Sequence, residues 1–156
     1  MKIMTSYFYQ IRNFKPNMIP LSTALFDPSY FHQGRGKNYQ FWDKNGVLNG
    51  VRAEVFMPGE ECEGLCHGPD GCKEKNKTVI CPFLKTYYEQ LKRLNFNEVM
   101  ERFKKLENSI LSTKSFEDEI IFVLIVYEAP NNPCSERGPL HWWFKDNGYE
   151  IEEFKK

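Results

Sequence analysis

Four cysteines gather in one short stretch of the chain, and thiolates are strong ligands for soft metal ions. They are Cys62, Cys66, Cys72 and Cys81, with three, five and eight residues between successive members. Glycines among them let the backbone fold tightly. Because four thiolates complete a tetrahedral shell, this spacing predicts a structural zinc site in a metal-binding loop at about 60–82.

An iron–sulfur cluster is the main alternative, because four cysteines also ligate such clusters and Pro82 follows Cys81 as in some ferredoxin runs. The spacing matches neither common ferredoxin pattern, which favours zinc. Unligated buried thiols are the plainer alternative, although four in one glycine-rich loop are uncommon. His67 adjoins Cys66, so it could replace one cysteine as a ligand or lie beside the site.

A second group of reactive side chains follows an apolar run near the end of the chain. Its members are Glu128, Cys134, Ser135 and Arg137. Ligands of open α/β sheets bind beyond the carboxyl ends of strands, and a helix N-terminus favours anions. We expect Arg137 to bind an anion with Ser135, and Glu128 and Cys134 to be catalytic with Arg137 if the protein is an enzyme. The plainer alternative is a Glu128–Arg137 ion pair and a small buried Cys134.

The elements that would position these groups alternate between strands and helices. Strands are expected at 3–9, 19–26 and 120–126, with a last one near 149–154, and helices at 83–94, 97–110 and 139–147. The run Ile120–Val126 is apolar without alternation, which is typical of a parallel strand buried on both faces. The pattern predicts an α/β fold, a three-layer Rossmann-like domain with a mainly parallel sheet.

Thr5, Ser6 and Tyr7 end the first expected strand, so we expect them to bind ligand at the same sheet edge as Arg137. Residues 27–81 lack a clear period and hold most of the ten glycines. Such a segment is long for a structureless loop, and we expect it to be a metal-stabilised irregular insert within one domain at 1–156.

Composition and hydropathy limit the partners and the cellular location that we expect for the chain. The chain has 156 residues, with 21 Lys plus Arg and 21 Asp plus Glu, so no overall basic field exists for coating nucleic acid. No segment has the roughly 20 apolar residues of a membrane helix, and the N-terminus lacks a signal-peptide pattern. We therefore expect a cytoplasmic protein with no membrane partner and with reduced cysteines.

A family resemblance rests on short motifs at both ends of the chain. Tyr127-Glu128-Ala129-Pro130, then Cys134, Arg137, Leu140 and Trp143, resembles the C-terminal signature of the domain of unknown function family 488. Thr5-Ser6-Tyr7-Phe8 and Ile19-Pro20-Leu21-Ser22 are similar to its N-terminal half. The resemblance covers about the first 30 and last 45 residues. It implies a Rossmann-like fold in a bacterial or phage setting and no particular activity. The family's Cys-His-Arg pattern is replaced here by Cys134-Ser135-Glu136-Arg137, without the histidine.

Three functions from different classes are consistent with these features. The leading hypothesis is a domain that binds a nucleotide or nucleic-acid phosphate and carries a structural zinc, whether or not it is an enzyme. The first alternative is a non-catalytic interaction module of phage or defence type, whose insert contacts a protein partner. The second alternative is an iron–sulfur or thiol redox protein.

Overall fold

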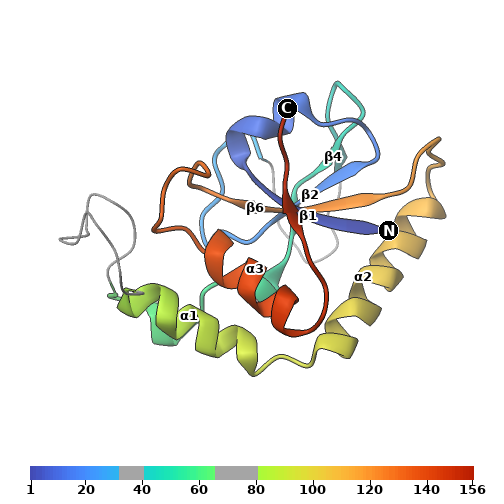
Figure 1. Ribbon diagram of the computed structural model, residues 1–156. Coiled ribbons are helices and arrows are strands. Elements are labelled where there is room, and N and C mark those ends of the chain that lie inside the picture. Colours follow the sequence, from blue (N-terminus) through green and yellow to red (C-terminus); the bar gives the residue numbers. More distant parts are fainter. Residues whose placement is uncertain (32–40, 66–80) are drawn as a thin grey trace.

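The computed structural model describes residues 1–31, 41–65 and 81–156. Its centre is a five-stranded sheet in the order β5-β2-β6-β1-β7 (Figure 1). The strands are β1 (Lys2–Tyr7), β2 (Met18–Ser22), β5 (Val51–Arg52), β6 (Ile121–Val126) and β7 (Glu152–Glu153). All four pairings between them are parallel, which confirms the predicted α/β class and mainly parallel sheet.

The central strand β6 is buried on both faces, as its unbroken apolar sequence predicts. Phe122 and Leu124 contact the core under the helices, whereas Val123 and Ile125 belong to a second core on the opposite face. Successive side chains of a strand point to opposite faces, so one strand supplies both cores.

All three α-helices cover the same face of the sheet (Figure 1). They are α1 (Pro82–Lys92), α2 (Phe96–Leu111) and α3 (Arg137–Asp146). The 3-10 helix η1 (Phe8–Asn13) supplies Phe8 and Ile11 to the core on the other face. One face of the sheet is therefore covered by α-helices and the other by a 3-10 helix. None of the helices in the described ranges is long and apolar enough to cross a membrane.

Capping residues explain where α2 begins and where α3 ends. The N-cap of α2 is Asn95, whose side chain accepts from the Glu98 amide, so the helix begins at Phe96, one residue before the predicted start at 97. The C-terminus of α3 is closed at Gly148, which has φ +78°. Its amide donates to the Lys145 carbonyl and the next amide donates to the Phe144 carbonyl, the Schellman pattern.

The described part of the insert is more regular than predicted. It contains β3 (Phe41–Trp42) and β4 (Leu48–Asn49), which pair antiparallel, then β5, η2 (Glu54–Phe56) and η3 (Glu60–Cys62). Strand β5 pairs with β2, and Leu48 and Phe56 lie in the main core at 1% exposure each. The expectation of an irregular insert is wrong for these residues, because strands of two residues are too short to show a period.

Replacing Phe122 by alanine tests the central core. Phe122 is fully buried and its ring centroid lies 5.4 Å from that of Phe103. We expect Phe122→Ala to lower the free energy of unfolding by about 3–5 kcal/mol through lost burial and a residual cavity. Phe26→Ala is the matched control, since Phe26 is 80% exposed and should change stability by less than about 0.5 kcal/mol. Urea unfolding followed by circular dichroism measures both, and similar losses would contradict the placement of β6.

Candidate functional site

The carboxyl end of β6 and the N-terminus of α3 lie at the same end of the molecule (Figure 1). In the sheet register, Thr5 of β1 lies beside Leu124 of β6 on one side and Glu153 of β7 on the other. Parallel strands present their carboxyl ends at a common edge, so chain segments that are distant in sequence meet here. The structure thereby brings Thr5 and the segment 128–137 together, as the sequence predicts.

Arg137 is the centre of a hydrogen-bond network at this edge. Its Nε donates to Glu153 Oε2 at 2.8 Å, and its Nη2 donates to the Glu128 backbone carbonyl at 2.8 Å. Ser135 Oγ accepts from the Arg137 backbone amide at 3.1 Å and from Nη1 at 3.4 Å. Only 10% of the Arg137 side chain is exposed. Its carboxylate partner in this network is Glu153, and Arg137 ties the loop 128–136 to the sheet.

Thr5 extends this network to α3. Its hydroxyl donates to Glu153 Oε2 at 2.5 Å and also lies 2.6 Å from His141 Nε2. The carboxylate of Glu153 therefore receives bonds from both Thr5 and Arg137. Burial lowers the pKa of His141 below its ordinary value of 6.5, and Arg137 adds to this effect while Glu153 opposes it.

The sequence interpretation did not include His141 or Glu153. His141 follows Arg137 by four residues, which places both on one face of a helix, and this spacing could have identified it. Glu153 lies in a strand of two residues with no motif around it. Its role follows from the pairing of β7 with β1, which the local sequence does not show.

Ser6 lies apart from Thr5 because adjacent strand residues face opposite sides of the sheet. Ser6 and Ser22 are both in register with Ile125, whose side chain belongs to the core beneath η1. Ser22 donates a hydrogen bond to Asp27, whereas Ser6 Oγ is buried with no partner in the described part of the chain. The predicted ligand-binding residues Thr5, Ser6 and Tyr7 are therefore divided between two faces.

Exposed apolar side chains follow three neighbouring strands at the carboxyl edge. We call this group the aromatic rim: Tyr9, Leu25, Phe26, Tyr30 and Tyr127, which are 48–80% exposed. Tyr30 and Tyr127 both contact the buried ring of Phe8, with centroid distances of 6.5 and 5.0 Å. Tyr127 also donates a hydrogen bond to the Phe26 carbonyl. These contacts join the loops after β1, β2 and β6 into one surface.

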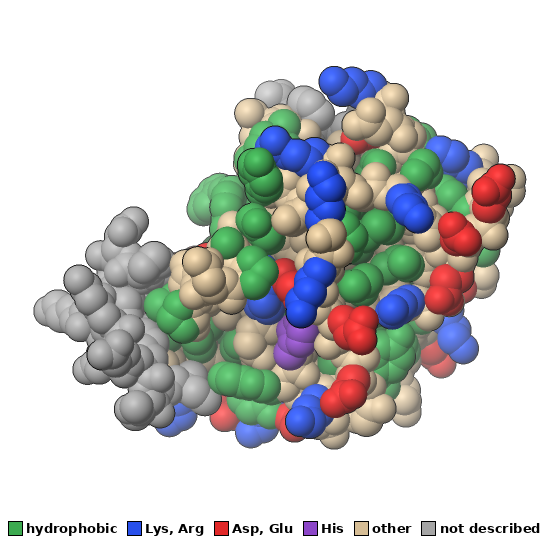
Figure 2. Space-filling view, turned by 45° about the horizontal axis from the view of Figure 1, so that its top comes forward, with side chains coloured by type: hydrophobic (Ala, Val, Ile, Leu, Met, Phe, Trp, Pro, Cys, Tyr) green, Lys and Arg blue, Asp and Glu red, His purple; other side chains and the backbone are tan. Residues whose placement is uncertain are grey.

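A cation lies at one side of the aromatic rim. The Arg12 guanidinium carbon is 3.8 Å from the centroid of the Tyr9 ring, and Arg12 Nε donates to the Tyr9 carbonyl. Tyr9 in turn stacks on Tyr7 at 6.3 Å. Figure 2 shows one face of the molecule, and it carries both basic and acidic side chains. A ligand at the rim would meet this positive charge at one place, beside Tyr9.

Two of the four predicted zinc ligands lie within the described ranges. Cys62 ends η3 and is 4% exposed, and Cys81 is the N-cap of α1 and is 8% exposed. Cys66, Cys72 and His67 lie outside the described residues. Burial raises the pKa of the Cys62 thiol, and Glu61 raises it further. No group of three metal-binding side chains occurs among residues 1–31, 41–65 and 81–156.

Cys134 lies apart from these cysteines, just before α3. Its thiol is buried at 3% exposure, and its backbone amide donates to Asn132 Oδ1 at 2.9 Å.

Comparisons with protein-family models, curated proteins and solved structures found no match to this chain. The resemblance to the domain of unknown function family 488 therefore stays a prediction.

Replacing Arg137 by alanine tests the buried network. Without Arg137, the Glu153 carboxylate loses its charged partner in a largely buried position, where it is 13% exposed. We expect Arg137→Ala to lower the free energy of unfolding by about 3–5 kcal/mol, and the double change Arg137→Ala/Glu153→Leu to recover part of that loss. Chemical unfolding measures both values.

The matched control is Arg93→Ala. Arg93 pairs with Glu61 at the surface, where the two side chains are 60% and 42% exposed. Exposed pairs contribute about 0–1 kcal/mol, so this change should be small. Equal losses for Arg93→Ala and Arg137→Ala would show that the Arg137 network adds nothing beyond a surface ion pair.

Proposed function

We propose that the chain binds a nucleotide or a single-stranded nucleic-acid segment at the carboxyl edge of a Rossmann-like sheet. The bases would lie against the aromatic rim and a phosphate would approach Arg12. The observation that carries the proposal is the rim itself, where exposed rings from three neighbouring loops meet at the edge of a parallel sheet.

Stacking on aromatic rings gives sequence-tolerant affinity of about 1–3 kcal/mol per base, because every base has a π-face. Arg12 is already held over Tyr9, so its guanidinium would lose little freedom on binding a phosphate. The chain has no net charge, which favours a short site over an extended basic groove. In this proposal Arg137 positions the loop that carries Tyr127. Glu128 and Cys134 stay proposed catalytic residues, and Ser135 stays a proposed ligand-binding residue.

Alanine substitutions in the rim test this proposal. We expect Tyr127→Ala and Tyr9→Ala each to weaken binding of a fluorescent single-stranded oligonucleotide or of a labelled nucleotide by about 5- to 100-fold, because each removes one stacking surface. Tyr9→Phe should retain most of the affinity. Fluorescence anisotropy gives the dissociation constants at a fixed salt concentration.

Leu111→Ala is the control, because Leu111 on α2 has the same 48% exposure as Tyr127 and lies outside the rim. No binding by the wild-type protein, or equal binding by the rim variants and Leu111→Ala, would refute the proposal.

We also propose that Cys62, Cys66, Cys72 and Cys81 hold a structural zinc in a reducing cytoplasm. Cys62 and Cys81 are buried in the same core, and η3 packs against α1. Burial, and after it the Glu61 carboxylate, raises the pKa of the Cys62 thiol. A bound cation would reverse this effect and stabilise the thiolate. The metal would then help to hold the end of the insert against α1.

Metal analysis of the purified chain tests the zinc proposal. We expect about one zinc per chain, and its loss together with reduced stability in Cys62→Ser. Cys134→Ser should keep the metal, because Cys134 precedes α3 and lies outside the cluster. Iron with acid-labile sulfide and visible absorbance would establish the iron–sulfur alternative. A stable protein without metal would refute both.

A protein partner is the second candidate ligand of the rim. Phe26 is 80% exposed, and Leu25 beside it has no ring to stack on a base. Exposed apolar groups of this kind are typical of protein-binding surfaces, which fits the interaction module of phage or defence type.

A further inference from the structure

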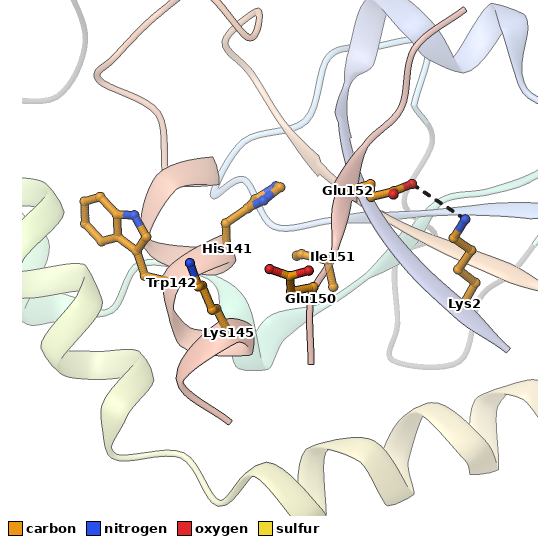
Figure 3. Close-up of a pocket in the computed structure, with 7 residues that line it drawn as sticks. All are labelled: Lys2, His141, Trp142, Lys145, Glu150, Ile151 and Glu152. Atoms are coloured by element: carbon orange, nitrogen blue, oxygen red, sulfur yellow. Dashed lines mark ion pairs between the residues drawn. The ribbon is translucent and has the colours of Figure 1, made fainter. Parts of the chain in front are cut away.

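A pocket of ≈ 480 Å³ lies beside the edge strand β7, and none of its lining residues belongs to the aromatic rim (Figure 3). Its wall is formed by His141, Trp142 and Lys145 of α3 and by the segment that leads from Glu150 into β7. Lys2 of β1 lies at its other end. Small-molecule sites typically have volumes of about 300–1,000 Å³, so the pocket could hold a compact ligand.

The buried network determines which nitrogen of the His141 ring carries the hydrogen. Thr5 has one hydroxyl hydrogen and donates it to Glu153, which also accepts from Arg137. The Thr5 oxygen must therefore accept from His141 Nε2. In the neutral ring this assigns the hydrogen to Nε2 and leaves Nδ1 with a free lone pair. No residue in the described ranges donates to Nδ1.

Two charged side chains at the pocket also lack a partner within the described residues. Lys145 lies one helical turn after His141, and Lys145 and Glu150 both line the pocket (Figure 3). Lys145 and Glu150 form no ion pair, whereas Lys2 pairs with Glu152 at 3.7 Å. Within the described part of the chain, the residues that line the pocket thus include one cation without an ion-pair partner, Lys145, and two acceptors without a donor, Nδ1 of His141 and the Glu150 carboxylate.

A ligand that satisfies all these groups needs an anion for Lys145 and at least two hydroxyl donors for Nδ1 and Glu150. Trp142 is 38% exposed at the wall, and an indole face favours the C–H face of a sugar ring. We propose that this pocket is a binding site for a small sugar phosphate. The site does not depend on the rim, and its ligand needs no base.

Titration with ribose 5-phosphate tests the site, with ribose and inorganic phosphate as separate probes. Tryptophan fluorescence and long-range ¹H–¹⁵N spectra of the histidine rings give the readouts. The chain has three histidines, and His141→Gln identifies the signals of His141 by their loss. We expect the neutral ring to show hydrogen on Nε2, and the Nδ1 resonance to shift only when ribose 5-phosphate is added.

Two substitutions then separate the roles of the ring and the cation. In His141→Gln the amide group can still donate to Thr5, but the Nδ1 acceptor is lost. We expect this change and Lys145→Ala each to weaken ribose 5-phosphate binding about tenfold, as expected for one hydrogen bond or charge. Leu111→Ala should bind as the wild type does. Thermal unfolding verifies that each variant is folded.

Several outcomes would overturn the proposal. They are hydrogen on Nδ1 in the neutral ring, no ribose 5-phosphate binding up to about 10 mM, or unchanged affinity in His141→Gln. Inorganic phosphate binding as tightly as ribose 5-phosphate would reduce the site to an anion site and refute the sugar. Rim substitutions are measured with other probes, so failure here leaves the nucleotide proposal untouched.

Discussion

The Glu153 carboxylate joins three parts of the fold that the backbone connects only weakly. Strand β7 contributes two residues to the sheet, in register with Met4 and Thr5 of β1. The same carboxylate accepts from Thr5 on β1 and from Arg137 at the start of α3. A largely buried charge is costly unless it is paired and hydrogen-bonded, so the positions of strand, helix and loop depend on one another.

The carboxyl edge therefore has two kinds of surface, a polar one on the helix side and the apolar one of the rim. On the helix side the polar groups bind one another, and Arg137 already uses its donors on Glu153, Glu128 and Ser135. The rings of the rim project outside this network and are free to contact a ligand. The hydrogen-bonded network thus fixes the elements that carry the exposed apolar surface.

The long elements could be predicted from the sequence because their signals are local. The unbroken run in β6 and the helical periods of α1 and α2 each span several residues that share one environment. Strand β5 could not be predicted from pattern, since two residues carry no period, whereas β7 lies within the strand expected near 149–154.

For the candidate site too, only the parts that depend on local sequence signals could be predicted. Arg137 and Thr5 were placed at one edge by the rule for parallel sheets, and the structure brings them together through Glu153. The choice of Glu153 as the partner, and the recruitment of His141, depend on contacts between elements far apart in the chain. The separation of Ser6 from Thr5 follows from strand alternation, which applies wherever a strand contributes consecutive polar residues.

The sheet order also constrains how the chain can fold during synthesis. Strand β1 is made long before either of its neighbours, because Lys2 pairs with Ile121 and Thr5 pairs with Glu153. Until β6 has been made, β1 and β2 have no central strand between them, and their apolar side chains stay uncovered. Such long-range parallel pairing slows folding and exposes unfinished chains to aggregation. The central part of the sheet can therefore form only after β6 has been made.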